Sequence, residues 1–480
     1  MRRHFSIFGL LTILITLVFV VSALVKEQSI MTILLFALFV VEFIYAVRRL
    51  FKNIILVLFL VAYFTFLMGR LVMPLFIDMD VYSDIFYSFL DFKPETNYHV
   101  ILSLYISLLF LFISYTITEA KVPNVIQPAF NPNSQKILVV RKWANIILWF
   151  SFPFALLVIL EKIRYVIING YAGMLLEQGS TLPSFVIILS VLFEYMVFLY
   201  LATLPSKRKA IPVIILYLIF SVMNIIGGDR GECMLSIFVV IYYFFLRNRL
   251  YRGSSLWISR KGITAIIMAA PLAMILLFSI AFVRDSKTID NTDAGLLIGG
   301  FFFQQGASMN VIACAYEDER YLPKGKLYSL GSIIDYFRNN YISRLILGTK
   351  PLAVGSTELA QKGNSLDPAI TYIENPQFYE NGGGMGSSYI AEAYYDFGYF
   401  GIILYSLIYG YVLASIPKWN AKNVWLSVIA LVFLKYIMYA PRARATGFIA
   451  AAASVAFWPI ALIIYLISSY YSASKDAKKN

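Results

Sequence analysis

The chain has 480 residues, of which 60% are hydrophobic and only 14% are charged, and its mean hydropathy is +0.74. This composition excludes a water-soluble enzyme of this size, and the 39 phenylalanines and 34 tyrosines exclude intrinsic disorder. The formal net charge of +13 would suit a nucleic-acid partner, but its meaning depends on which segments carry it.

Apolar runs of about 17 to 25 residues, the length that a helix needs to cross the hydrocarbon core of a bilayer, recur along the whole chain. The first run follows Arg2 and Arg3 but is longer than the apolar part of a signal peptide, so we expect an uncleaved helix. We predict an all-α integral membrane protein with about twelve transmembrane helices, at residues 5–25, 29–47, 53–76, 99–118, 144–160, 183–204, 211–226, 233–246, 263–283, 388–415, 424–440 and 448–468.

The distribution of charge orients these helices. With the N-terminus in the cytoplasm, basic residues crowd the cytoplasmic segments, where the only acidic residues are Glu119 and Asp476. The positive-inside rule therefore predicts that both termini are cytoplasmic. The surplus charge is then a topology signal, and we expect no nucleic acid as a partner.

The predicted topology divides the chain into three parts. Residues 1–283 hold the first nine helices, and residues 388–480 hold the last three and a basic tail. Residues 284–387 form one large extracytoplasmic loop. Its amphipathic run near Ile334, Phe337, Tyr341 and Leu345 predicts short helices that lie on the outer leaflet or enter it.

Several common active-site motifs are absent. Cys233 and Cys314 belong to no zinc motif, and we expect two buried free thiols. The only histidines, His4 and His99, lie outside the large loop, which excludes a histidine base there. A P-loop and a GxSxG motif are also absent, which argues against a nucleotide-driven pump and a hydrolase, and we expect no cofactor. The pattern Asp78–Asp80 could hold a divalent ion, but acidic outer loops are common, and we favour a site without metal.

The first informative motif is the turn Gly227–Glu232 between two spans. Its glycines allow a tight turn close to a ligand, and the planar guanidinium of Arg230 can bind phosphate oxygens in pairs. A purely structural turn explains the motif equally well. In that case Arg230 faces lipid phosphates or pairs with Asp229 or Glu232.

The second motif is the glycine-rich segment Asn381–Ser388, which runs into the tenth predicted span. Glycines and serines at a helix start leave backbone N–H groups free, and the helix dipole there favours an anion. The candidate binding residues are Gly384, Gly386, Ser387 and Ser388.

Two carboxylates follow that segment within the same span. Glu392 and Asp396 are four residues apart, so we expect them on one helical face within three turns of the outer surface. A charge at this depth costs about 2.5–3.5 kcal/mol. Either Lys435 or Arg70 compensates by forming an ion pair, or a water-filled cavity opens outward and lets a carboxylate accept hydrogen bonds from a polar substrate.

Further arginines lie at predicted outer helix ends. Arg284 ends the ninth span, and Arg442 and Arg444 lie in a brief outer turn. Each alone suits a side chain that reaches the membrane interface. Together with Arg230 around one glycine-rich helix start, they predict a site for a polyanion such as a lipid diphosphate.

The chain resembles the Wzy-type O-antigen and capsular polysaccharide polymerases of bacteria. The resemblance rests on the turn at 227–232, the segment at 382–401 and the layout of twelve spans with one large outer loop. It implies a metal-independent membrane glycosyltransferase of the GT-C-like class in the bacterial cytoplasmic membrane. Its substrates would be polyprenyl-diphosphate-linked oligosaccharides at the outer face, and its partners would include a flippase and a chain-length regulator.

By this resemblance, Arg230, with Arg284 and Arg442 or Arg444, would hold the diphosphate. Glu392 would orient or deprotonate the acceptor hydroxyl. One alternative is a flippase or another twelve-span polysaccharide transporter, which deep acids such as Glu194 would suit. Another is an O-antigen ligase-like transferase, although the loop histidine usual in ligases is absent.

Overall fold

The structure, a computed structural model, describes residues 2–77, 92–176, 181–250, 256–284, 294–339, 343, 346, 348 and 352–477. Every regular element in these ranges is a helix, as predicted. The long helices are α1 (Arg2–Val25), α2 (Gln28–Arg48), α3 (Leu50–Tyr63), α5 (Pro94–Glu119), α6 (Gln135–Leu176), α7 (Ser184–Ala202), α8 (Lys207–Ile226), α9 (Arg230–Leu250), α10 (Arg260–Arg284), α18 (Tyr389–Lys422), α19 (Val424–Ile437) and α21 (Phe457–Ala477).

Within the described ranges, ten helical segments are long and apolar enough to cross a membrane, and each matches a predicted span. The predicted span 263–283 lies within α10. The predicted span 424–440 is the shorter α19, which has 14 residues. A helix of that length covers only about 21 Å, less than the roughly 30 Å of a hydrocarbon core. The turn that follows α19 therefore lies within the thickness of the helical bundle.

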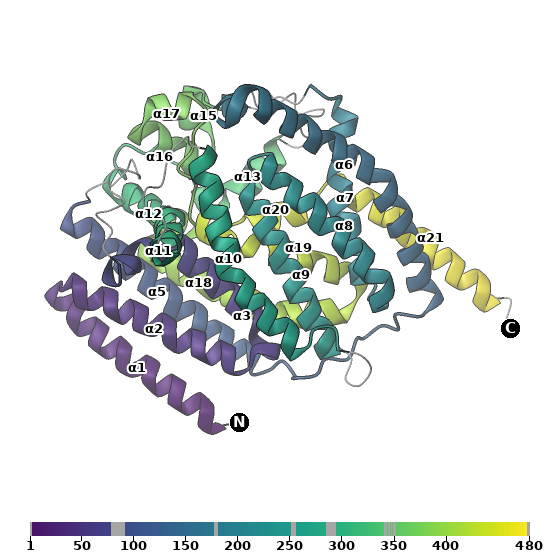
Figure 1. Cartoon of the computed structure of the whole chain (residues 1–480), viewed down its shortest axis with the longest axis horizontal. Coiled ribbons are helices and arrows are strands. Elements are labelled where there is room, and N and C mark those ends of the chain that lie inside the picture. The colour runs from purple at the N-terminus through teal and green to yellow at the C-terminus, as the bar shows by residue number, and fades with distance from the viewer. Residues whose placement is uncertain are drawn as a thin grey trace.

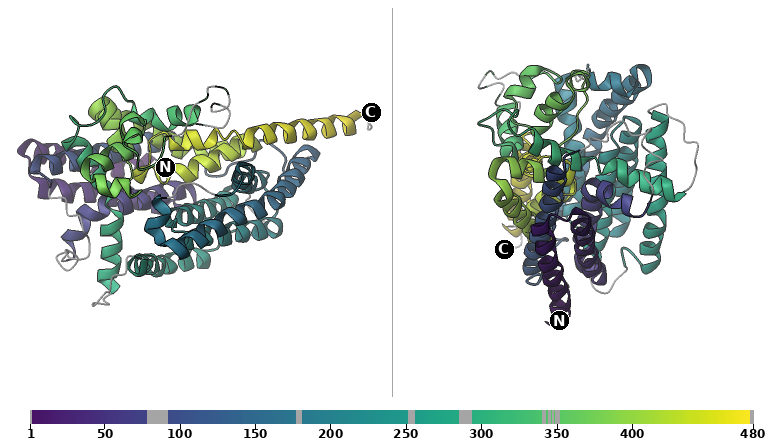
Figure 2. Two further views of the ribbon diagram at one scale, coloured as in Figure 1. Left: turned by 90° about the horizontal axis from the view of Figure 1, so that it is seen from above. Right: turned by 90° about the vertical axis from the view of Figure 1, so that its left-hand side faces the viewer.

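The helices form one bundle. In Figure 1, α1 and α2 flank it on one side and α6 and α21 on the other, with α3, α9, α18 and α19 between them. The left view of Figure 2 shows α21 extending well beyond its neighbours. The short helices α15 (Thr357–Lys362), α16 (Leu366–Glu374) and α17 (Pro376–Glu380) gather at one end of the bundle, away from the start of α1 and the end of α21 (Figure 1).

Short helices occupy much of the described part of the segment between α10 and α18. In addition to α15–α17 they are α11 (Ala294–Gln305), α12 (Ser308–Glu317), η4 (Tyr328–Leu330) and α13 (Gly331–Asn339). In α13 the side chains of Ile334 and Phe337 are 38% and 63% exposed, whereas α12 is almost entirely buried. The other two residues of the predicted amphipathic run, Tyr341 and Leu345, lie outside the described residues.

Helix α18 turns back on itself at Gly398. This glycine has φ 62° and ψ −153°, and a Cβ atom on Gly401 would clash with the Ala393 carbonyl oxygen. The rings of Tyr389 and Tyr409 have centroids 4.5 Å apart, although a straight helix would separate these residues by about 30 Å. The predicted span 388–415 therefore contains a reversal of chain direction within α18. Residues 389–397 form a short arm that packs against the membrane-spanning remainder.

The contacts of the arm with α5 show at which level of the bundle residue 389 lies. On α5, Ser107 contacts the hydroxyls of both Tyr389 and Ser406, whereas His99 contacts the Tyr394 and Tyr399 rings. Eight helical residues separate His99 from Ser107, so the arm begins about 12 Å below Tyr399. The chain therefore descends through residues 382–388 and rises again along the arm. Along the arm, Glu392 therefore lies nearer the end that Ser107 contacts, and Asp396 lies nearer the end that His99 contacts.

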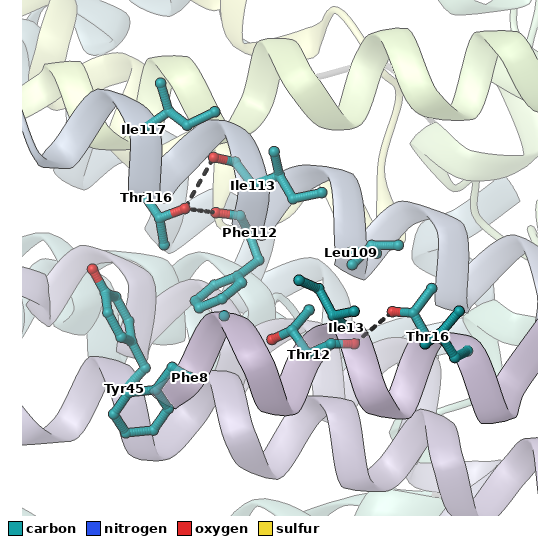
Figure 3. A pocket seen from close by; sticks show the side chains of 12 residues that line it. Phe8, Thr12, Ile13, Thr16, Tyr45, Leu109, Phe112, Ile113, Thr116 and Ile117 are labelled. Atoms are coloured by element: carbon teal, nitrogen blue, oxygen red, sulfur yellow. Dashed lines mark hydrogen bonds between the residues drawn. The ribbon is translucent and has the colours of Figure 1, made fainter. Parts of the chain in front are cut away.

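A large apolar cavity opens between α1, α2 and α5 (Figure 3). Its volume is about 410 Å³, and Phe8, Ile13 and Phe112 are among the residues that line it. The hydroxyl groups of Thr16 and Thr116 donate to carbonyls of their own helices, so most of the wall is apolar, although the Thr12 hydroxyl has no hydrogen-bond partner among the described residues. Such a cavity suits hydrocarbon rather than a polar substrate.

The two cysteines are buried free thiols, as predicted. Cys233 lies in α9 and Cys314 in α12. Neither forms a disulfide, so the fold depends on helix packing.

Candidate functional site

The candidate site forms where the glycine-rich segment 382–388 meets the turn 440–446. This turn joins α19 to α20 (Gly447–Ala452) and begins with the short helix η5 (Ala440–Arg442). A Cβ atom on Gly386 would lie 3.7 Å from the Arg442 carbonyl oxygen. The structure thus brings together two of the predicted segments, separated by more than fifty residues of chain.

Glu392 connects these two segments. Its side chain is fully buried, and both of its carboxylate oxygens accept hydrogen bonds from the chain. The Ser387 hydroxyl donates to Oε1 at 2.7 Å, and the Ala445 N–H donates to Oε2 at 2.8 Å. The Tyr409 hydroxyl donates to the Ala445 carbonyl at 2.6 Å, so Ala445 is held through both its N–H and its carbonyl group. Glu392 therefore orients the turn that carries the two arginines.

Sequence reasoning missed Asp367, at the start of α16. The Gly386 N–H donates to its Oδ1 at 2.8 Å, and the Thr371 hydroxyl donates to the same atom at 3.1 Å. The Met385 N–H donates to Thr371 at 3.0 Å. The place predicted for a bound anion is therefore occupied by a carboxylate of the chain. Nothing in the sequence marks this aspartate, which lies 17 residues before Gly384.

Burial raises the pKa of the Asp367 carboxyl above its ordinary value. Hydrogen bonds from Gly386 and Thr371 and the positive charges of Arg444 and Arg442 oppose this shift. No donor among the described residues contacts Oδ2 within hydrogen-bonding distance. Asp367 is thus a partly buried carboxylate with one oxygen available to a ligand, close to two arginines.

The two arginines of the turn 440–446 are half-buried. Arg442 donates from Nη1 to Gln305 Oε1 at 3.3 Å, and its guanidinium lies 5.8 Å from the centroid of the Phe66 ring. The Nη1 atom of Arg444 lies 3.6 Å from Asp335 Oδ2, and its side chain is 41% exposed. Both guanidinium groups therefore keep N–H donors and charge that a ligand can reach.

The turn 227–232 adjoins this site. A Cβ atom on Gly231 would lie 3.3 Å from the Tyr439 hydroxyl, which places Arg230 next to the residues that precede Arg442. The two acidic residues of this turn form ion pairs with lysines of other helices. Asp229 Oδ2 lies 3.8 Å from Lys162 Nζ, and Glu232 Oε2 lies 2.5 Å from Lys435 Nζ. Arg284 ends α10, and its side chain lies outside what the structure describes.

Lys435 is fully buried and forms ion pairs with Glu194 and Glu232. The Tyr217 hydroxyl also donates to Glu194, at 2.7 Å. The alternative in which Lys435 compensates for Glu392 or Asp396 is therefore wrong. Arg70, the other cation considered for that role, lies with its guanidinium 4.7 Å from the centroid of the Phe303 ring.

Asp396 has a structural role in the described chain. It accepts hydrogen bonds from the backbone N–H groups of Tyr328 and Ser329, at 3.0 Å and 2.8 Å, and from the Ser329 hydroxyl at 2.5 Å. These bonds fasten η4 to the arm of α18. Both predicted carboxylates accept hydrogen bonds from neighbouring segments of the chain.

One histidine lies closer to the large loop than its sequence position indicates. His99 belongs to α5, but its ring stacks on that of Tyr316 in α12, with centroids 4.3 Å apart and planes inclined by 12°. The exclusion of histidine chemistry from the loop followed from chain position alone, so it overlooked this contact. Folding brings His99 to the loop.

No group of three or more metal-ligating side chains occurs within the described ranges. Asp78 and Asp80, the pair considered for a divalent ion, lie outside those ranges. The polar centre found in the structure is therefore built from arginines, carboxylates and glycine backbone.

The fold and the site define an integral membrane protein with a basic polar centre inside its helical bundle. The sequence model of the family O-antigen polysaccharide polymerase Wzy matches residues 6–475, and the chain belongs to this family. The resemblance drawn from residues 227–232 and 382–401 is thus confirmed. No curated protein and no solved structure matches the chain.

Proposed function

We propose that this protein polymerises polyprenyl-diphosphate-linked oligosaccharide repeat units into O antigen or a related polysaccharide at the outer face of the bacterial cytoplasmic membrane. Membership of the polymerase family supports the reaction class. The observation that carries the proposal is the attachment of the arginine-bearing turn to the glycine-rich segment through Glu392. That attachment fixes two guanidinium groups beside Asp367.

The reaction requires charge stabilisation more than a strong base. An acceptor hydroxyl oxygen bonds to the anomeric carbon of the growing glycan, and the bond from that carbon to the carrier diphosphate breaks. The electron pair stays on the diphosphate, where Arg442 and Arg444, with Arg230 and Arg284, stabilise the developing negative charge. Diphosphate is a good leaving group, so these residues can suffice without a metal.

The acceptor hydroxyl also loses a proton. We assign this proton to Asp367, because one of its oxygens is available to a ligand and its raised pKa favours proton uptake. Glu392 acts as a positioning residue, since both of its oxygens are already occupied. In this arrangement the glycine segment holds the base, and Gly384 leaves room beside it: a Cβ atom there would lie 3.2 Å from both Asp367 oxygens.

One assay separates polymerase from transporter. Purified protein in detergent, given synthetic lipid-diphosphate repeat units and no partner protein, should produce a ladder of lengthened glycans. A flippase would leave the size of the substrate unchanged. Addition of a chelator should not alter the ladder, and a requirement for Mg²⁺ or Mn²⁺ would direct attention to Asp78 and Asp80.

In the same assay, arginine variants test whether these side chains bind the diphosphate. Arg230→Ala and Arg442→Ala should abolish elongation while the protein remains folded and inserted in the membrane. Arg320→Ala is the matched control, because Arg320 is exposed, follows α12 and has its guanidinium 5.3 Å from the centroid of the Tyr321 ring. Normal ladders from the first two variants would remove the proposed diphosphate site.

The outer location has its own test. A reporter fused near Lys324, in the segment between α12 and η4, should be accessible only from outside the cytoplasmic membrane. Activity of that reporter in the cell interior would place the site on the wrong side for a flipped substrate.

A further inference from the structure

A second cavity, separate from the arginine-bearing turn, lies where α5 begins and the arm of α18 ends. Its volume is about 310 Å³. The residues that line it are Lys26, Gln28, Pro94, Glu95, Tyr98, His99, Tyr316 and Tyr399. These come from the connection between α1 and α2, the first turns of α5, α12 and the reversal of α18. No residue of this cavity has a role in the function proposed above.

We propose that this cavity is a saccharide-binding subsite, which accommodates one or two sugar residues of the lipid-linked glycan away from the point of transfer. This proposal rests on the polymerase function, because it assigns a place for the glycan part of that substrate. The cavity is here called the tyrosine pocket.

Its walls have the chemistry that sugars require. Tyr98, Tyr316 and Tyr399 are half-buried, so each ring presents a face or an edge to the cavity while its position is fixed by packing. The C–H faces of a pyranose pack on such rings, and the hydroxyl groups at its edge seek hydrogen bonds. Tyrosine offers the ring and a polar group on the same side chain.

The aromatic walls are preorganised by His99. The ring of His99 stacks on Tyr316, and its Nδ1 atom lies 2.9 Å from the Tyr399 hydroxyl. Ser103 lies 3.4 Å from Nε2, on the opposite side of the ring. His99 is 1% exposed, and its two contacts hold Tyr316 and Tyr399 in place. A ligand would therefore not have to order these rings, which lowers the entropic cost of binding.

The rim supplies polar groups of both charges. Glu95 and Lys26 are exposed, and Gln28 donates to the Pro94 carbonyl at 2.5 Å, which joins the connection between α1 and α2 to the start of α5. A carboxylate can accept two hydrogen bonds from neighbouring sugar hydroxyls, and an ammonium group can donate to ring and hydroxyl oxygens. This mixed rim suits an uncharged or weakly charged polyol better than a phosphate.

The tyrosine pocket and the arginine-bearing turn are connected by the short arm of α18. Glu392 lies near the deep end of this arm, and Tyr399 follows its outer end. Seven helical residues span about 10 Å, a distance that an oligosaccharide of a few sugars can bridge. The larger cavity between α1 and α5 is lined mostly by apolar side chains and by no charged one, so it suits the glycan less well.

A binding experiment tests the subsite without the transfer reaction. The probe is the oligosaccharide mixture released by partial hydrolysis of the polysaccharide made by cells that carry this protein, and it contains neither lipid nor diphosphate. Saturation-transfer NMR on the full-length protein in nanodiscs should detect binding. Tyr316→Ala should weaken binding about tenfold or more, whereas Tyr321→Ala, which alters an exposed tyrosine five residues away, should not.

A second variant avoids the risk that loss of Tyr316 disturbs packing. Glu95→Gln removes one exposed rim charge and should weaken binding several-fold with no change in thermal stability. Its matched control is Glu27→Gln, the same chemical change on an exposed residue that does not line the cavity. Unchanged affinity in both Tyr316→Ala and Glu95→Gln would overturn the subsite.

The same series separates failure of the subsite from failure of the proposed function. If the protein elongates lipid-linked glycans and the pocket variants bind the probe normally, the subsite is wrong and the function stands. If the wild type binds the probe through the pocket but never elongates it in lipid-linked form, the subsite stands and the function is wrong. Loss of probe binding only when the nanodiscs contain an anionic lipid would identify a lipid headgroup site and overturn the proposal.

Discussion

Glu392 accepts a hydrogen bond from the backbone N–H of Ala445 at 2.8 Å, across 53 residues of chain. Because Ala445 is the neighbour of Arg444, this bond sets the direction in which the arginine-bearing turn leaves α19. The Ser387 hydroxyl occupies the other carboxylate oxygen at 2.7 Å. A carboxylate that sequence reasoning assigned to the substrate is thus bonded to the chain on both sides.

Glu392→Gln should retain most of the polymerising activity. The amide oxygen can accept from Ala445 and the amide nitrogen can donate to the Ser387 hydroxyl, so the turn keeps its position. Glu392→Ala removes both bonds and should lower kcat by roughly a hundredfold, because the arginines lose their alignment. Rates of elongation of lipid-linked repeat units measure both effects. A loss of activity in the Gln variant as large as in the Ala variant would make Glu392 the proton acceptor.

Asp367→Asn should abolish most of the activity of a folded protein, by roughly 10² to 10⁴ in kcat, the usual contribution of a general base. The base works only when it has lost its proton, and burial raises its pKa. In the wild type, kcat should therefore rise with pH as the carboxyl ionises and then level off. The measurement is a pH profile of kcat. If the profile of the Asn variant kept the same rise, another group would be the base.

Asp318 should make the folded protein less stable as the pH rises. Burial and the neighbouring Glu374 raise the pKa of Asp318 from its ordinary value of 3.8 to about 7. Between these two values the folded state holds a proton that the unfolded state has released, so the free energy of unfolding falls as the pH increases across this window. Asp318→Asn should flatten this part of a plot of thermal midpoint against pH. An unchanged slope would exclude Asp318 as its source.

Lys435→Met should destabilise the fold by about 3–5 kcal/mol, because it leaves Glu194 and Glu232 without their buried cation. Lys362→Met is the control. Lys362 pairs with Glu358 on the surface, where both side chains are more than half exposed, and such a pair contributes about 0.3–0.5 kcal/mol. Unfolding in detergent measures both. Equal losses would mean that the Lys435 pairs are as well hydrated as the surface pair.

Much of the fold could be predicted because a bilayer imposes long apolar runs on the sequence, and ten predicted spans match helices of the structure. The reversal at Gly398 could not be predicted, because the residues on both sides of it are apolar or aromatic and hydropathy does not record direction. The 14 residues of α19 likewise run on into Met438, Tyr439 and Ala440, which carry no charge, so the sequence indicated a longer helix.

The candidate site was predictable in part. Glycine runs and arginines at helix ends are visible in one sequence, and the structure brings the segments 382–388 and 440–446 together. Asp367 and His99 were missed for a different reason. Each is a single polar residue that belongs to no motif in the sequence. Their partners are distant along the chain: Asp367 contacts Gly386, and His99 contacts Tyr316.

The buried amine of Lys435 also has a mechanical consequence. By joining α7, α9 and α19, it fastens the helix that begins with Arg230 to the helix that ends just before Arg442. The spacing between the two backbone segments that carry Arg230 and Arg442 is thereby constrained before any substrate binds. A carrier lipid with a longer or shorter charged head group would fit this spacing less well. The packing of the helices would therefore contribute to selection among carrier lipids.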